Sequence, residues 1–325
     1  MPRTTQLMTR RTTTCQAIAL CITLLLSVSV RSASAEVVRV PFGWAAGQSR
    51  AYQVSTSVER AGNLMGGRCT LTGRLAVTVQ QRDAKSAHMR LLLTALKADD
   101  GCDTPSMRQH IWRQLADIPL DMVLEPATRN VTMPDIERVR ESFFSAVGES
   151  RLWFGRPAPA AMRKQITEQL RTVFVTDDML AKSTGLVVDL MSAVGREYDT
   201  GTVDQVAVTM PNPFGGGRLP ATASIGAAFA AANRDEFVFT IATRYDNAAY
   251  AAALKKMVGA IVADTPGEAE ANARRQDRLD VGSTLKQRIQ LSTGWVIESE
   301  TKSTMQLNAG TQTDIVKMVF LPAAK

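Results

Sequence analysis

Apolar and polar residues alternate along two neighbouring segments in the first third of the chain. Nearly every second residue from 69 to 79 is apolar, and after a polar turn at 82–85 the alternation continues from 89 to 93. A period of two places successive side chains on opposite faces of a β-strand. The pattern therefore predicts a β-hairpin that buries one of its two faces.

The same alternation predicts further strands on both sides of this hairpin. Segment 52–58 precedes the hairpin and 120–124 follows it, so the amino-terminal part is expected to be a meander. Beyond Gly201, strands are predicted at 206–210, 237–241, 285–291, 295–307 and 313–321. Several of these run about twelve residues or more, and strands of that length twist and curve.

Between the two strand regions the apolar period changes to 3.6, which is typical of helices with one buried stripe. Pro134 and Asp135 begin the first of these helices, and two more are predicted from about Pro159 and from Asp177. Asp246 is expected to cap a fourth helix in the carboxy-terminal part.

These elements together predict an α+β protein, in which one or more long, curved antiparallel β-sheets pack on a central group of helices. Antiparallel strands are expected over residues 36–133, a helical segment over 134–195, and further strands with one helix over 196–325. The order strand, helix, strand, helix, strand is compatible with one continuous domain or with two halves, each a sheet with its helices.

Residues 1–35 have the three parts of a secretory signal peptide. Basic residues without acids precede the apolar run Ala17–Val30, and Ala33-Ser34-Ala35 precedes Glu36. The apolar run is shorter than the roughly twenty residues that cross a bilayer as a helix. We therefore expect cleavage between Ala35 and Glu36, a periplasmic or secreted mature protein, and no transmembrane span within it.

Removal of this segment changes the charge of the protein. The whole chain has 38 basic and 31 acidic residues and a net charge of +7, but the signal carries four arginines and no acid, which leaves the mature chain at +3. Most of the net positive charge of the whole chain thus comes from the signal peptide, and nucleic acid is not an expected partner.

Cysteine usage follows the same division. Two of the four cysteines lie in the signal, so Cys69 and Cys102 remain as an even pair in an oxidising compartment. In an antiparallel hairpin that turns near Lys85, these two residues lie almost opposite each other. We expect a Cys69–Cys102 disulfide that closes a loop of about 34 residues and stabilises the fold by roughly 3 to 4 kcal/mol.

No catalytic constellation emerges from the remaining chemistry. His88 is interpreted as a strand side chain near solvent and His110 as a loop residue, and Gly-x-Ser-x-Gly is absent. Ser283-x-x-Lys286 matches a penicillin-binding pattern, but in a strand rather than at a helix start. The glycine-rich segment 211–217 and the acidic segment 99–103 are interpreted as turns. We predict no catalytic, cofactor-binding or metal-binding residues.

Three features carry a resemblance to known proteins. They are the opening strand 47–58, the segment Asn212-Pro-Phe-Gly-Gly and the hairpin Leu291-Ser-Thr-Gly-Trp295. Together with the exported start, these features resemble uncharacterised exported bacterial β-rich proteins, a domain of unknown function. The resemblance rests on turn chemistry and implies no catalytic residues. A curved sheet over helices is also similar to the architecture of bacterial lipoprotein carriers.

The resulting leading hypothesis is a non-enzymatic envelope protein whose apolar-lined sheet binds a lipid-like ligand or a partner protein. One alternative is an envelope scaffold that acts only through its surface. Another is a periplasmic hydrolase with a site assembled from scattered Asp, Glu and Ser residues and His88 or His110.

Overall fold

The computed structural model describes residues 36–62, 67–100, 102, 105–128, 130–149, 164, 167–168, 185–186, 188–212, 217–230, 233–262, 279–307 and 310–322. The predicted signal peptide, the helix predicted from Pro159 and most of the helix predicted from Asp177 lie outside these residues. From Val37 onward the chain forms one compact unit.

Two series of strands build the unit. The first comprises β2 (Ser49–Gly62), β3 (Gly67–Arg82), β4 (Ala87–Ala98), β5 (Pro119–Glu125) and β6 (Asn130–Thr132). The second comprises β8 (Val203–Pro211), β9 (Arg218–Ala230), β10 (Asn233–Tyr245), β11 (Asp280–Gln290), β12 (Val296–Leu307) and β13 (Gly310–Leu321). A short pair, β1 (Val37–Arg39) and β7 (Glu197–Asp199), forms a separate two-stranded sheet.

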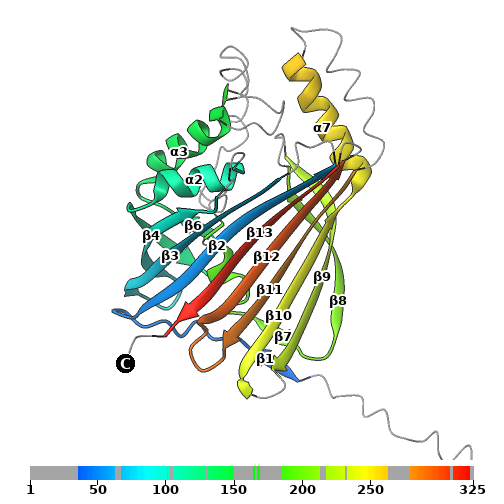
Figure 1. Ribbon diagram of the computed structural model, residues 1–325. Coiled ribbons are helices and arrows are strands. Elements are labelled where there is room, and N and C mark those ends of the chain that lie inside the picture. Colours follow the sequence, from blue (N-terminus) through cyan, green and yellow to red (C-terminus); the bar gives the residue numbers. More distant parts are fainter. Residues whose placement is uncertain are drawn as a thin grey trace, which may run out of the picture. The chain divides into compact units, whose positions relative to one another are not determined.

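All strands of the two series join in one antiparallel sheet of eleven strands. Its order is β6-β5-β4-β3-β2-β13-β12-β11-β10-β9-β8 (Figure 1). Each series is a meander of sequence neighbours, and the two meanders meet where β2 pairs with β13, from Ala51 opposite Leu321 to Gly62 opposite Gly310. The predicted hairpin 69–93 and the three predicted closing strands are confirmed, and both predicted strand regions belong to the same sheet.

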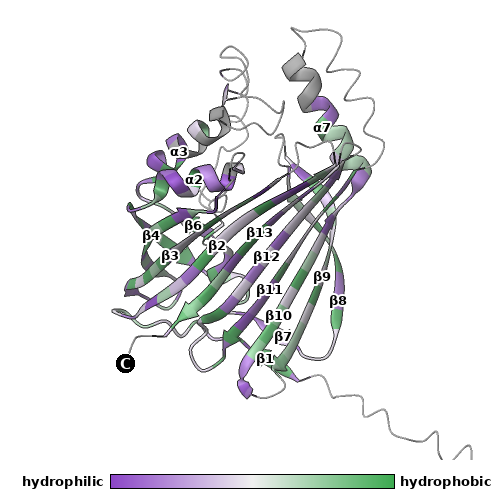
Figure 2. Cartoon of the chain, in the orientation of Figure 1, coloured by the Kyte–Doolittle hydropathy of each residue, from purple (hydrophilic) through white to green (hydrophobic). Residues whose placement is uncertain are grey.

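The sheet has one apolar and one polar face. Along β3, for example, Leu71, Leu75, Val77 and Val79 are buried, while the alternate positions 72, 74, 76 and 78 are exposed or half-buried. This is the alternation expected of an antiparallel sheet with a core on one side and water on the other, and Figure 2 shows it along the strands. We call the side that carries these residues the core face and the opposite side the outer face.

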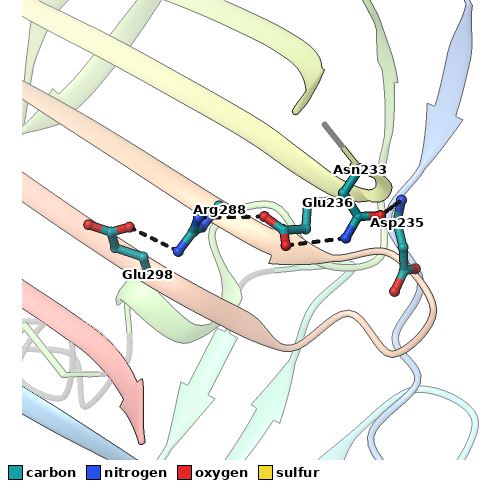
Figure 3. A network of polar contacts seen from close by, with 5 residues as sticks. All are labelled: Asn233, Asp235, Glu236, Arg288 and Glu298. Atoms are coloured by element: carbon teal, nitrogen blue, oxygen red, sulfur yellow. Dashed lines mark hydrogen bonds and ion pairs between the residues drawn. The ribbon is translucent and has the colours of Figure 1, made fainter. Parts of the chain in front are cut away.

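Charged ladders cover part of the outer face. Arg288 on β11 lies 3.6 Å from Glu236 on β10 and 3.4 Å from Glu298 on β12, and the Asn233 amide donates to Glu236 at 3.2 Å (Figure 3). Lys317 and Glu300 form a similar pair across β13 and β12 at 2.7 Å. Exposed pairs of this kind contribute little stability, about 0 to 1 kcal/mol each, so they mark a solvent-facing surface.

The helices are distributed over different parts of the sheet, and two of them contact each other. They are α2 (Met107–Leu115), α3 (Ile136–Glu149), α6 (Val188–Met191) and α7 (Asn247–Val262). Helix α2 contacts α3 and β4, α6 contacts β12, and α7 contacts β9. The expected central group of helices is therefore not supported by the described residues, although the large antiparallel sheet is. The period of 3.6 predicts helices but not which strands they cover.

One helix was not expected from the sequence, because His110 was interpreted as a loop residue. His110 lies in α2, which begins after Ser106. The Ser106 hydroxyl accepts from the Gln109 backbone N–H and the Gln109 side chain accepts from the Ser106 N–H, a reciprocal capping box. The Gln109 amide also donates to the backbone carbonyls of Thr56 and Cys69 at 3.0 and 2.9 Å, which fixes α2 to β2 and β3.

The expected turn at 292–294 fastens the amino-terminal segment to the sheet. Trp295 stacks on Trp44 with ring centroids 4.9 Å apart, and the Trp295 indole N–H donates to Gln48 at 3.0 Å. Gly294 has a positive φ of 72°, and a Cβ built there would lie 2.0 Å from the carbonyl oxygen of Pro41. Only glycine fits this close approach of two backbones.

The structure joins Cys69 and Cys102 in a disulfide, with Cα atoms 4.4 Å apart and a sequence separation of 33 positions. Cys69 lies near the start of β3, and Cys102 follows the end of β4. The backbone N–H of Asp99 donates to the Thr70 carbonyl at 3.0 Å beside it. The bond thus ties the far end of the hairpin to the chain that leads into α2.

Candidate functional site

The core face is fully packed at one end of its strands and half-exposed at the other. At the end next to the β11–β12 turn, Trp44, Phe237 and Ile289 are at most 1% exposed. At the opposite end, where β10 leads into α7 (Figure 1), several core-face residues of β10 to β13 are only half-buried. We call this second region the α7 end; its half-buried residues include Ile241, Val281, Ser283, Ser303, Met305 and Asp314.

A row of polar side chains crosses four strands at the α7 end. Thr243 on β10 is paired with Ser283 on β11, Ser283 with Ser303 on β12, and Ser303 with Asp314 on β13. Paired residues of neighbouring antiparallel strands lie on the same face, about 5 Å apart. These four residues, which we call the polar row, therefore form a stripe of three hydroxyls and a carboxylate about 14 Å long.

Apolar residues surround the polar row on the same face. Towards the packed end, the next pairs are Ile225 with Ile241 and Ile241 with Leu285. Towards the sheet edge, Ala223 is paired with Thr243 and with Val206, which is 39% exposed. The α7 end thus offers a surface with a hydrogen-bonding stripe between apolar flanks.

Opposite charges meet where the polar row ends on β13. The Arg60 guanidinium donates to the Gln312 side-chain oxygen at 3.1 Å, and the Gln312 amide donates to the Asp314 carboxylate at 2.8 Å. Burial lowers the pKa of Arg60, while the nearby Asp314 carboxylate raises it. The cation and the anion are linked through one amide, so their charges largely offset each other locally.

A buried carboxylate lies next to this region, on the short helix α6. Asp189 is 3% exposed, and the Thr301 hydroxyl of β12 donates to its carboxylate at 2.9 Å. The Gln287 amide of β11 donates to the Asp189 backbone carbonyl. Burial raises the pKa of Asp189 to about 6, against the hydrogen bonds from Thr301 and Ser299 and the charge of Arg108, which lower it.

The raised pKa of Asp189 makes stability depend on pH. Between about pH 4 and pH 6 the folded protein holds a proton on this carboxyl that the unfolded chain has released. The protonated carboxyl therefore makes its full contribution to the free energy of unfolding below about pH 4, and this contribution is lost as the pH rises through about 6. We expect Asp189→Asn to raise the free energy of unfolding at neutral pH by about 2 kcal/mol and to flatten its decline between these pH values. Urea unfolding across this range measures both effects. An unchanged slope in the variant would show that another group dominates.

The structure places the residues considered in the sequence far from one another. His88 is exposed on the outer face of β4, and His110 is half-buried in α2. Ser283 is on the core face while Lys286, three positions along the same strand, is exposed on the outer face. Ser283 and Lys286 therefore do not form a catalytic pair, since residues an odd number apart in a strand lie on opposite faces.

Other expected turns are described only in part. Asn212 is buried at the end of β8, and 213–216 lie outside the described residues. Asp99 and Asp100 are exposed after β4, whereas 101 and 103 are also outside them. Within the part of the chain that the structure describes, no cluster of His, Cys, Asp and Glu has the arrangement of a metal site, and no helix is long and apolar enough to cross a bilayer.

Comparison with known proteins finds no match among protein-family models and none among curated proteins. Among solved structures, one of lipovitellin, described for its lipid–protein interactions, is 10% identical with a TM-score of 0.38; the match covers 86% of this chain and 26% of the lipovitellin chain. A DUF1329 family protein from Desulfovibrio piger is 8% identical with a TM-score of 0.19, over 86% of this chain and 88% of that one. A loose resemblance is all that these values show, and neither likeness establishes a family or an activity.

Proposed function

We propose that the protein is an exported, non-enzymatic envelope protein that binds a lipid-like ligand at the α7 end of the core face. The difference in burial between the two ends of the core face supports this proposal. One sheet face is packed to near-complete burial around Phe237 and Ile289, yet a few residues further along the same strands Ile241 and Val281 remain half-exposed. Covering such apolar surface stabilises a complex by roughly 25 cal/mol per Å².

The residues at the α7 end support a ligand rather than water as the neighbour. Ile225, Ile241 and Leu285 lie side by side across three strands, and Val206 continues the apolar surface to the edge of the sheet. The outer face of the same strands carries lysines, arginines and glutamates instead. An apolar surface that is half-covered and confined to one face is the usual setting of a binding site.

A charge placed on this surface is expected to weaken binding strongly. Ile241→Lys would put an ammonium group against the apolar part of the ligand, and we expect at least about a tenfold loss of affinity for an uncharged fluorescent probe such as N-phenyl-1-naphthylamine. The matched control is Thr240→Lys, one position along β10 and on the outer face. Probe titration gives the affinities, and circular dichroism verifies that both variants are folded.

Equal affinity of the two folded variants, or a wild-type protein that binds no probe and carries no lipid in native mass spectrometry, would overturn the proposal. Wild-type protein purified from a bacterial periplasm is expected to release a co-purified lipid on solvent extraction. The Ile241→Lys protein should release much less, because the same surface holds the natural ligand and the probe.

A further inference from the structure

We propose that the polar row binds the headgroup of the ligand, and that this headgroup is uncharged and carries hydroxyl groups, as in a monoacylglycerol. This inference rests on the proposed function and names the ligand class for the same surface. Thr243, Ser283, Ser303 and Asp314 would contact the headgroup, and the chain of the amphiphile would lie on Ile241 and Leu285.

The hydroxyls of the polar row have capacity for a ligand. Among the residues that the structure describes, no side-chain hydrogen bond joins Thr243, Ser283 or Ser303 to a neighbour. Thr243 is 9% exposed as a residue, and its hydroxyl oxygen still reaches the surface of the protein. A ligand that brings donors and acceptors to this row can bind these hydroxyls in place of water, because each hydroxyl can both donate and accept.

Charge selects among the amphiphiles that could bind. An anionic headgroup at the row would face the Asp314 carboxylate, and the buried carboxyl of Asp189 lies one row away, bonded to Thr301. A cationic headgroup would face Arg60, which is bound to the same Gln312 as Asp314. An uncharged polar headgroup avoids both repulsions.

The apolar residues beside the polar row determine where the hydrocarbon chain of the ligand would lie. Thr243 and Ser283 are each two positions from Ile241 and Leu285 on the same strands, and residues two apart share a face. A headgroup on the hydroxyls therefore directs its chain onto these apolar neighbours, about 7 Å along the strands. The surface has the order of an amphiphile, with the polar part and the apolar part adjacent.

Three probes with the same chain length test the headgroup: 1-monolauroylglycerol, laurate and dodecylamine. Isothermal titration of the wild-type protein at neutral pH is expected to show about tenfold tighter binding of monolauroylglycerol than of either charged probe. Removing two hydroxyls in Ser283→Ala/Ser303→Ala should weaken monolauroylglycerol about tenfold, since a hydrogen bond changes affinity by a factor of about two to ten, and should leave laurate unchanged. The matched control is Thr284→Ala/Thr304→Ala, which removes two hydroxyls from the outer face of the same strands.

The outcomes separate this inference from the proposed function. Equal binding of the three probes, tighter binding of a charged probe, or equal effects of the two double variants would overturn the headgroup inference while the surface still binds amphiphiles. Failure of every probe to bind, together with a wild-type protein free of lipid, would overturn both. Loss of monolauroylglycerol preference in the core-face double variant alone would support the assignment of the polar row.

Discussion

Replacing Gly294 by Ala is expected to lower the free energy of unfolding by about 3 kcal/mol or more. The new Cβ would lie 2.0 Å from the Pro41 carbonyl oxygen, so one of the two backbones must move, and the residue would also keep a positive φ of 72° that favours glycine. Movement there would separate the turn from segment 41–48 and loosen the stack of Trp44 on Trp295. Urea unfolding followed by tryptophan fluorescence measures the loss.

Gly47→Ala separates the two causes. Gly47 has a similar φ of 82°, but nothing lies within 4 Å of a Cβ built there, so only the backbone conformation opposes the change. We expect that variant to lose about 1 kcal/mol. If Gly294→Ala is no less stable than Gly47→Ala, the close approach to Pro41 does not constrain the fold.

Removal of the disulfide is expected to have an effect of similar size. In the Cys69→Ala/Cys102→Ala variant the unfolded chain regains the freedom of a loop of 33 positions, which corresponds to about 3 to 4 kcal/mol on the loop-entropy model. The urea midpoint should fall without a change in the folded secondary structure, because Gln109 still binds the carbonyls of Thr56 and Cys69 from α2.

Chemical reduction provides the control for the disulfide. Reducing agent removes the bond and no side chain, so it should bring the wild-type protein close to the stability of the double variant and leave that variant unchanged. A wild-type midpoint that does not respond to full reduction would show that the bond contributes nothing to stability.

Strands with strong alternation are predictable from the sequence. Alternation predicts β3, β4 and the closing strands β11 to β13 because each buries one face and leaves the other in water. Strand β9 is not predicted by alternation. Its core face carries Ala221, Ala223 and Ala227 in place of large apolar residues, and alanine has little preference for strands. Helix α2 is not predicted because it has only nine residues, so its buried apolar positions Ile111, Trp112 and Leu115 give too short a period to identify a helix.

The candidate site is not predictable in this way, because it exists only across strands. Thr243, Ser283, Ser303 and Asp314 come from four strands, and within one strand a polar residue at an inward position looks only like an interruption of the apolar pattern. Their proximity depends on the register of three pairings. A sequence signal was present in part, since Ser283 belongs to the Ser-x-x-Lys286 segment, but its motif pointed to a different chemistry.

The pairing of β2 with β13 also imposes an order on biosynthesis. A chain made from its amino terminus produces β2 early. Gln312, the hydrogen-bond partner of Arg60 across the pairing, follows 252 positions later in the sequence. Until then the first meander exposes a long unpaired edge that other chains can pair with. A polypeptide with such distant contacts folds slowly. The eleven-stranded sheet is therefore complete only once the last strand of the chain has paired with the first strand of its series.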